Sequence, residues 1–222
     1  MSPEAEKIVD LYQRKALDWI RRREHSGGLM EQAWLDRFRA LMPPNGSILD
    51  IGCGSAVPIA RYLIGAGHSV TGVDTSSTFI DLCRNRYPAQ EWLLADMRTL
   101  ALARSFDGIL AWDSFFHLTP DDQCKMFPVF QQHAAPGAAL MFTSGTGHGE
   151  AIGDFEGEPL YHGSLDPAEY RSLLDQHGFR IVAHVVEDMD CGRHTVWLAQ
   201  NIVGPQRPDS SRTARGNYAG AA

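Results

Sequence analysis

The chain has 222 residues, of which 44% are hydrophobic and 21% are charged, and its formal net charge is −7. The length and composition allow one globular α/β domain with additions or two small domains, and the acidic balance argues against a nonspecific grip on nucleic acid, which needs a basic face. No apolar run is long enough to cross a bilayer, the first residues do not form a signal peptide, and none of the four cysteines belongs to a Cys-x-x-Cys pair. We therefore expect a cytoplasmic protein with no membrane span and no metal.

Two helices are expected before the first strand. Apolar residues recur at helical spacing over residues 3–24 and again over 30–42. Gly27 and Gly28 separate the two stretches. Tyr12 lies on the apolar stripe of the first helix, where an aromatic residue is more often part of the core than a ligand contact.

Residues 47–56 form the most informative stretch, Ser-Ile-Leu-Asp-Ile-Gly-Cys-Gly-Ser-Ala. Its apolar run is typical of a strand buried on both faces of a parallel sheet. Gly52 and Gly54 have no β carbon, so the backbone can turn sharply there and approach a ligand closely. A helix is expected over 56–66. The loop thus lies between the carboxyl end of a strand and a helix, where open α/β sheets bind ligands.

The spacing of glycines and acids narrows the kind of ligand. A dinucleotide fingerprint needs a third glycine where the chain has Val57, and no Gly-Lys-Ser/Thr phosphate loop is present. Further strands are expected at 69–74 and 91–94. Asp74 ends the first of these and Asp96 lies just past the second. An acid at the first position can accept hydrogen bonds from both hydroxyls of a ribose.

This series of strand ends resembles the class I S-adenosylmethionine-dependent methyltransferases. In that family the glycine loop cradles the methionine part of the cofactor, the acid after the second strand holds the ribose, and the acid after the third meets the adenine amino group. The resemblance implies S-adenosyl-L-methionine as cofactor and S-adenosyl-L-homocysteine as product. It implies cofactor contacts from Tyr12, Asp50, Gly52, Cys53, Gly54, Asp74, Thr75, Asp96, Met97 and Trp112.

Several of these residues have a second interpretation. Asp50 either accepts a hydrogen bond from its own loop or lies near the cofactor amine. Cys53 is either a nucleophile or, as we favour, a small buried residue under the loop. Asp74 could instead cap the following helix, and Asp96 could be a turn acid.

The remaining elements complete a Rossmann-like three-layer α/β sandwich. Helices are expected at 77–86, 120–133 and 167–177, and strands at 106–112, 138–143, 179–186 and 194–199. Alternating strands and helices mean right-handed crossovers and a parallel sheet, whereas the short link between the last two strands makes them antiparallel. We therefore expect a seven-stranded, mostly parallel sheet that ends in an antiparallel hairpin.

One domain is expected over residues 1–203. The resemblance implies that residues 1–44 form a helical lid and residues 45–203 the α/β core. Residues 144–165 are rich in glycine and are expected to be a long connecting loop. Residues 204–222 have little apolar content and are expected to be disordered.

Residues after the fourth strand are the candidates for catalysis. Asp113 and His117 are predicted to be catalytic, because an imidazole titrates near neutrality and can take a proton from a hydroxyl or amine. A histidine that only fixes its loop is the alternative. Substrate contacts are predicted from Phe115, His148, Tyr161 and His162. His194 is a further candidate, whereas His177 lies at a helix end and more simply interacts with the helix dipole.

The acceptor is expected to be a small molecule. The fourth strand ends Trp112-Asp-Ser-Phe, not the Asn/Asp-Pro-Pro-aromatic motif of amino-methylating DNA enzymes. The leading hypothesis is a monomeric or homodimeric methyltransferase that moves a methyl group to an oxygen or nitrogen of a small molecule, with no nucleic acid or membrane partner. An NAD-dependent oxidoreductase and a non-catalytic S-adenosylmethionine-binding protein are the alternatives.

Overall fold

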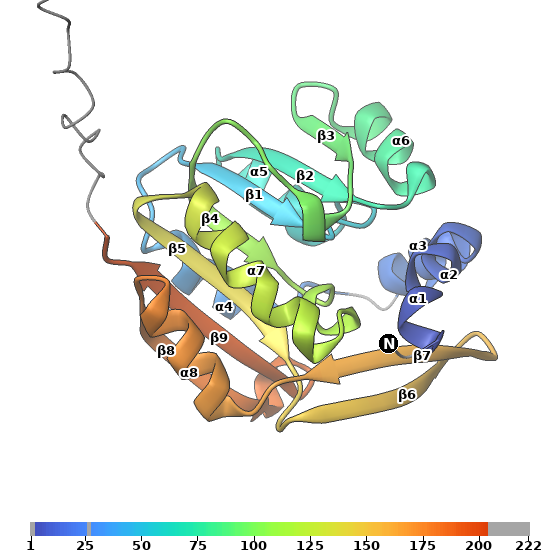
Figure 1. Ribbon diagram of the computed structural model, residues 1–222. Coiled ribbons are helices and arrows are strands. Elements are labelled where there is room, and N and C mark those ends of the chain that lie inside the picture. The colour runs from blue at the N-terminus through green and yellow to red at the C-terminus, as the bar shows by residue number, and fades with distance from the viewer. Residues whose placement is uncertain (1–2, 26–27, 204–222) are drawn as a thin grey trace, which may run out of the picture.

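The computed structural model describes residues 3–25 and 28–203. Its centre is a seven-stranded sheet with the strand order β3-β2-β1-β4-β5-β9-β8 (Figure 1). The strands are β1 (Ser47–Ile51), β2 (Ser69–Asp74), β3 (Glu91–Leu94), β4 (Phe106–Ala111), β5 (Ala134–Ser144), β8 (Phe179–Asp188) and β9 (His194–Asn201). Neighbours from β3 through β5 run parallel, whereas β9 is antiparallel to both β5 and β8. The expected sheet is confirmed.

Helices cover both faces of this sheet. On one face pack α4 (Gln32–Arg39), α5 (Ile59–Gly65) and α6 (Ser77–Arg86), and on the other α7 (Pro120–His133) and α8 (Pro167–Gln176). Successive side chains of a strand point to opposite faces. In β1, Ile48 joins the first core cluster, while Leu49 and Ile51 join the second. Burial on both faces explains why the strand is apolar at successive positions.

Two predicted helix starts are confirmed by their capping contacts. At the start of α7, the side chain of Thr119 accepts a hydrogen bond from the amide of Asp122 (3.2 Å). At the start of α8, Asp166 and Glu169 form a capping box. Each such cap stabilises its helix by about 1 kcal/mol.

The amino-terminal region contains more helices than predicted. Residues 3–25 form three short helices, α1 (Pro3–Glu6), α2 (Ile8–Arg14) and α3 (Ala16–His25). Figure 1 shows them as a group beside the sheet, and α3 contacts α6. By contrast, α4 buries Trp34 and Phe38 in the core and is a layer of the sandwich.

The prediction of a long connecting loop over residues 144–165 is wrong. Strands β6 (Gly149–Phe155) and β7 (Glu158–Ser164) form a two-stranded antiparallel sheet there. Their turn consists of Glu156 and Gly157, both with positive φ (53° and 77°), as a two-residue type I′ turn requires. Glu-Gly is not among the dipeptides that usually signal this turn, so the glycines looked like a loop.

This hairpin holds the amino-terminal helices. Arg14 of α2 donates two hydrogen bonds to the carboxylate of Glu158 in β7 (2.8 and 2.7 Å). The ammonium of Lys15 lies 3.6 Å from the same carboxylate. The helices and the hairpin, separated by more than a hundred residues in the sequence, are therefore joined by an ion-pair cluster.

The predicted tail, residues 204–222, lies outside the described residues. Within the described ranges the longest helix is α7, with 14 residues, and no helix there combines the length and apolarity needed to cross a membrane.

Candidate functional site

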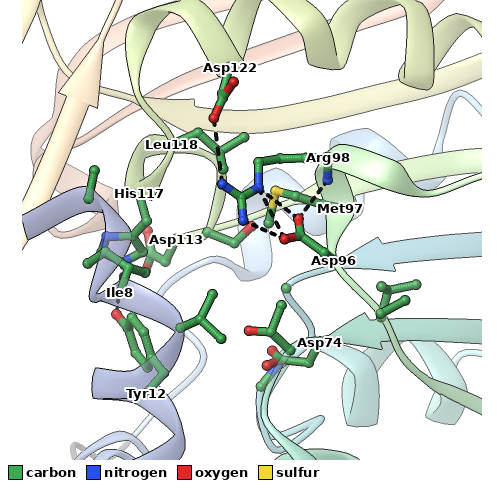
Figure 2. A pocket seen from close by; sticks show the side chains of 18 of the residues that line it. Ile8, Tyr12, Asp74, Asp96, Met97, Arg98, Asp113, His117, Leu118 and Asp122 are labelled. Carbon is green, nitrogen blue, oxygen red and sulfur yellow. Dashed lines mark hydrogen bonds and ion pairs between the residues drawn. The ribbon is translucent and has the colours of Figure 1, made fainter. Parts of the chain in front are cut away.

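A cavity of about 130 Å³ lies at the carboxyl ends of β1 to β4 (Figure 2). Gly52 and Gly54 follow β1, Asp74 ends β2 and Asp96 follows β3, and all four line this cavity. The predicted contacts Tyr12, Thr75 and Met97 line it as well. The fold thus brings together residues that the sequence places at three separate strand ends, as the geometry of a parallel sheet requires.

Backbone amides hold the carboxylate of Asp74 at the cavity wall. Its Oδ2 accepts a hydrogen bond from Gly54 (3.0 Å) and its Oδ1 one from Ser76 (2.9 Å). Burial raises the pKa of Asp74, and these amides oppose the rise. The cap of α6 is Ser76, so the alternative role of Asp74 as that cap is not what the structure shows. A carboxylate oxygen can accept more than one hydrogen bond, so both oxygens of Asp74 can still accept one from a ligand.

Backbone conformation and close packing require glycine at both positions of the loop. Gly52 has φ 79° and Gly54 φ 51°, in the left-handed region that favours glycine. A β carbon at Gly52 would lie 2.2 Å from the β carbon of Ser114, and one at Gly54 would lie 2.9 Å from the ring of Trp19. These positions therefore present only backbone atoms to the cavity.

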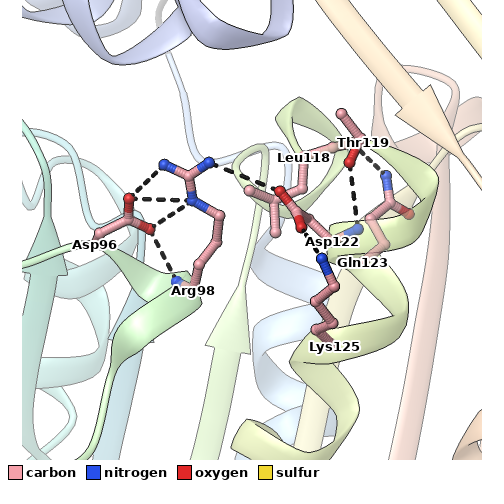
Figure 3. Close-up of polar contacts among 7 residues, drawn as sticks. All are labelled: Asp96, Arg98, Leu118, Thr119, Asp122, Gln123 and Lys125. Atoms are coloured by element: carbon pink, nitrogen blue, oxygen red, sulfur yellow. Dashed lines mark hydrogen bonds and ion pairs between the residues drawn. The ribbon is translucent and has the colours of Figure 1, made fainter. Parts of the chain in front are cut away.

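Asp96 belongs to an ion-pair cluster beside the same cavity (Figure 3). Arg98 places its Nη2 2.6 Å from Oδ2 of Asp96 and its Nη1 3.7 Å from Oδ2 of Asp122, in the first turn of α7. Asp96 also caps the 3₁₀ helix η1 (Met97–Thr99) by accepting the amide of Arg98 (2.9 Å). Burial alone would raise the pKa of Asp96, but Arg98 lowers it. Asp96 is thus a turn acid in this geometry, and any ligand must share its carboxylate with Arg98.

A second cavity of about 460 Å³ adjoins the first. The two cavities share Tyr12, Trp19, Gly52, Asp113 and His117. The walls of the second cavity also include Trp112, Phe116, Phe155, His162 and His194. Together the two cavities reach the size usual for small-molecule sites, about 300–1,000 Å³.

Asp50 is a buried carboxylate that lines the second cavity. It is 3% exposed, and its side chain makes no hydrogen bond or ion pair with any described residue. Burial, with a smaller contribution from the charge of Asp74, raises the pKa of Asp50 to about 7. The loop amides of Gly52 and Cys53 donate to the carbonyl of Val73 instead. The alternative in which Asp50 accepts a hydrogen bond from its own loop is therefore not observed.

Tyr12 and His117 are joined where the two cavities meet (Figure 2). The Nδ1 of His117 lies 2.8 Å from the carbonyl oxygen of Tyr161, which can only accept, so Nδ1 carries the proton. Burial lowers the pKa of His117 to about 4, and its ring is therefore neutral at pH 7. Nε2 then accepts a hydrogen bond from the hydroxyl of Tyr12 (2.8 Å). Both ring nitrogens of His117 are engaged.

Asp113 and His194 form an ion pair in the wall of the second cavity. Nε2 of His194 lies 3.0 Å from Oδ1 of Asp113, and Nδ1 lies 2.6 Å from the carbonyl oxygen of Cys191. Both neighbours accept, so both nitrogens carry protons and the ring is cationic. The hydrogen bond to Asp113 is the main cause that raises the pKa of His194 to about 9. Asp113 itself has a positive φ of 49°.

Three predicted substrate contacts lie outside both cavities. Phe115 is fully buried in the aromatic core. Tyr161 is fully buried too, and its carbonyl oxygen is the group that contacts His117. His148 is exposed and pairs with Glu169 (2.7 Å). Our proposals therefore do not use these three side chains as ligand contacts.

Cys53, Trp112 and His162 do line the second cavity, as predicted for ligand contacts. Burial is the main cause that raises the pKa of the Cys53 thiol well above its ordinary value, so this residue is not a ready nucleophile.

Sequence reasoning missed Trp19, Arg98 and Phe155 as site residues. Trp19 lies on the recognised apolar stripe of the first helix, but only the tertiary structure shows its ring against Gly54. Phe155 lies in the hairpin that was expected to be a loop, and it stacks on Tyr12 with ring centroids 6.1 Å apart. An alternating pattern search over residues 149–164 is the signal that could have found it.

Comparison with known proteins agrees with this geometry. A family model described as "Methyltransferase domain" matches residues 48–137. A similar fold is that of the 1,6-didemethyltoxoflavin-N1-methyltransferase of Burkholderia thailandensis, solved with bound 1,6-didemethyltoxoflavin and S-adenosylhomocysteine. The TM-score is 0.70 at 17% identity, over 90% of this chain and 91% of that chain. Residues 48–137 therefore match the methyltransferase domain, and the chain has the fold of that S-adenosylhomocysteine-bound methyltransferase.

Two curated methyltransferases are similar to this chain in sequence. An O-methyltransferase of Pyrenophora dematioidea is 28% identical over 177 residues, which cover 74% of this chain and 64% of that protein. A malonyl-[acyl-carrier protein] O-methyltransferase of Pseudescherichia vulneris is 32% identical over 99 residues, 44% of this chain and 38% of that protein. The matches thus span less than two thirds of the length of these relatives.

Proposed function

We propose that this protein is a methyltransferase that transfers a methyl group from S-adenosyl-L-methionine to an oxygen or nitrogen of a small-molecule acceptor. The observation that carries the proposal is the buried carboxylate of Asp50, which has no partner among the described residues. It lines a cavity that adjoins the one lined by Asp74, an acid that can accept hydrogen bonds from ribose hydroxyls. A buried anion without a partner is costly. A cationic ligand group would supply the partner that the described residues lack.

The residues of the first cavity suit the adenosyl part of the cofactor. Asp74 has acceptor capacity for the two ribose hydroxyls, and Val73, Phe79 and Met97 provide apolar walls for a purine. Asp96 is proposed at the adenine amino group, shared with Arg98. In the second cavity Asp50 suits the ammonium of the methionine part. We also retain Tyr12, Gly52, Cys53, Gly54, Thr75 and Trp112 as proposed cofactor contacts.

When bound, the sulfonium of the cofactor supplies an activated methyl group. The chain then contributes mainly position and the exclusion of water. Tyr12 and Trp19 from α2 and α3 cover the junction of the cavities, and the Arg14–Glu158 contact holds these helices on the hairpin. We propose that α1 to α3 act as a lid and that transfer takes place at this junction.

We place the acceptor in the second cavity. Trp112, Phe116 and Phe155 give it aromatic walls, which favour a planar acceptor. The curated relatives are O-methyltransferases and the similar structure is an N-methyltransferase, which supports oxygen or nitrogen as the accepting atom. We also propose a cytoplasmic monomer or homodimer with no nucleic acid partner; the four free thiols and the net charge of −7 support the location and the lack of that partner.

Isothermal titration calorimetry tests this function. We expect S-adenosylmethionine and S-adenosylhomocysteine to bind and NAD not to bind. Asp74→Ala should weaken binding of S-adenosylhomocysteine at least about tenfold, or about 1.4 kcal/mol, because a charged acceptor is lost. Asp107→Ala is the matched control, since Asp107 also accepts a backbone amide, from Ser47 (2.8 Å), but lines neither cavity. Binding of NAD alone would overturn the assignment.

A further inference from the structure

Three histidines line the second cavity, and two of them have no free ring nitrogen. His117 uses Nδ1 for the carbonyl of Tyr161 and Nε2 for the hydroxyl of Tyr12. His194 carries protons on both nitrogens, for the carbonyl of Cys191 and for Asp113. A base needs an unprotonated nitrogen with its lone pair directed at the substrate. In this geometry neither ring offers one.

His162 of β7 is the third histidine, and its ring is open on one side. The ring is half-buried and packs against the rings of Phe116 and His117, with both centroid distances 5.2 Å. The backbone carbonyl of Leu160 is the backbone acceptor that acts on the ring, and no described side chain hydrogen-bonds to it. A neutral imidazole has one unprotonated nitrogen, and no described side chain occupies its lone pair.

The position of Gly153 indicates which ring nitrogen of His162 faces the hairpin backbone. A β carbon on Gly153, opposite in β6, would lie 3.2 Å from Cε1 and 3.5 Å from Nδ1 of His162, and 3.6 Å from the carbonyl oxygen of Leu160. The Cε1–Nδ1 edge thus faces the hairpin backbone and Leu160. We therefore expect Nδ1 to carry the proton, which leaves Nε2 for the cavity.

Burial keeps this ring neutral at pH 7. Burial lowers the pKa of His162, and the charge of Asp113 and the carbonyl of Leu160 oppose the fall. The other titratable or charged groups that line the same cavity are Tyr12, Arg22, Arg23, Asp50, Cys53, His117, Asp154 and His194. Their mixed signs leave burial as the dominant influence.

We infer that His162 is the catalytic residue that takes the proton of the acceptor, through Nε2, and that the acceptor carries a hydroxyl group. This inference rests on the proposed function. The acceptor O–H bond breaks and its proton goes to Nε2. The oxygen electron pair forms the bond to the methyl carbon, and the electrons of the broken methyl–sulfur bond remain on sulfur. His117 then acts as a positioning residue that holds Tyr12 of the lid.

Histidine NMR of the whole chain tests the tautomer without an acceptor. Long-range ¹H–¹⁵N spectra across a pH series, assigned with His162→Gln and His117→Gln, report the protonation of each ring nitrogen. We expect His162 as the Nδ1–H tautomer, titrating below pH 6.5, with Nε2 unprotonated at pH 7. An Nε2–H tautomer, or a ring that is still protonated at pH 7, would overturn the inference.

Turnover with three aromatic probes tests the chemistry: phenol, benzoate and aniline. We expect methylation of the hydroxyl probe, and a fall in its kcat on the order of a hundredfold in His162→Gln. His162→Ala should recover activity when imidazole is added, whereas His117→Gln should keep the pH dependence of the parent. His148→Gln, exposed and outside both cavities, is the control. Methylation of benzoate or aniline without the phenol, or an equal loss in His148→Gln, would refute a base at His162.

Calorimetry with S-adenosylhomocysteine separates this failure from that of the proposed function. If the parent protein binds S-adenosylhomocysteine and the NMR result is the wrong tautomer, only the role of His162 fails. If the parent does not bind S-adenosylhomocysteine, the proposed function fails as well. Unchanged binding in His162→Gln also shows that this variant is folded.

Discussion

Gly52 offers the sharpest test of the loop geometry, because the chain contains a matched control. Gly52 and Gly137 have nearly the same φ, 79° and 80°. A β carbon at Gly52 would lie 2.2 Å from that of Ser114, whereas one at Gly137 would meet nothing within 4 Å. The two alanine variants thus share the cost of a left-handed backbone and differ in crowding.

The expected losses follow from these two terms. The left-handed conformation costs an alanine about 1–2 kcal/mol, and crowding in a packed site adds about 1–3 kcal/mol. Gly137→Ala should therefore lose about 1–2 kcal/mol and Gly52→Ala about 2–5 kcal/mol of unfolding free energy. Urea unfolding followed by tryptophan fluorescence measures both, with the slope checked for two-state behaviour.

A second readout links the loop to ligand binding. Gly52→Ala should also weaken binding of S-adenosylhomocysteine, because the displaced loop lines both cavities, whereas Gly137→Ala should not. In a double-mutant cycle, Ser114→Gly should recover part of the crowding cost in Gly52→Ala. Equal stability losses at positions 52 and 137 would refute the reasoning.

Three further predictions concern charged groups. The pKa of Asp50 is raised from 3.8 to about 7, so the native state loses stability as pH rises through that window. Asp50→Asn should therefore be more stable than the parent at pH 8 by urea unfolding, and it should bind S-adenosylmethionine more weakly. A less stable variant would contradict an unpartnered carboxylate. The pKa of His194 is raised from 6.5 to about 9, so its pairing with Asp113 stabilises the fold below pH 6.5, and this stabilisation is lost as pH rises to about 9. Plots of unfolding free energy against pH for the parent and His194→Gln should converge across this window. Parallel plots would rule the ion pair out. Glu158→Gln should change the free energy of unfolding little, because its pair with Arg14 is exposed, yet it should speed amide hydrogen exchange in α2. Unchanged exchange would mean that other contacts hold α2 on the hairpin.

The fold could be predicted because its signals are local. The apolar run before Gly52, the acid at Asp74 and the caps at Thr119 and Asp166 each act within a few residues of the element they define. Parallel topology then forces the strand ends to one edge. The hairpin over residues 149–164 was missed because its turn dipeptide is unusual and its strands contain glycines.

The partners of the site residues could not be predicted, because they come from distant parts of the chain. His117 looked like a candidate base, but its nitrogens are filled by Tyr12, 105 residues away, and by a carbonyl in the hairpin that was expected to be a loop. Asp96 was predicted to meet the adenine amino group or to be a turn acid, and only the tertiary structure shows that its carboxylate pairs with Arg98. Residue type and spacing indicate which groups reach a site. Whether those groups already have hydrogen-bond partners depends on tertiary contacts.

Three exceptions to good packing and pairing lie in the wall of the second cavity. Asp50 is a buried carboxylate without a partner among the described residues, Asp113 adopts a positive φ without being glycine, and Gly52 tolerates no side chain. Each costs stability, and such costs persist where function requires them. All three residues line the second cavity. These three costs fall at the same strand ends that the glycine loop and Asp74 indicate, which supports a functional site at this edge of the sheet.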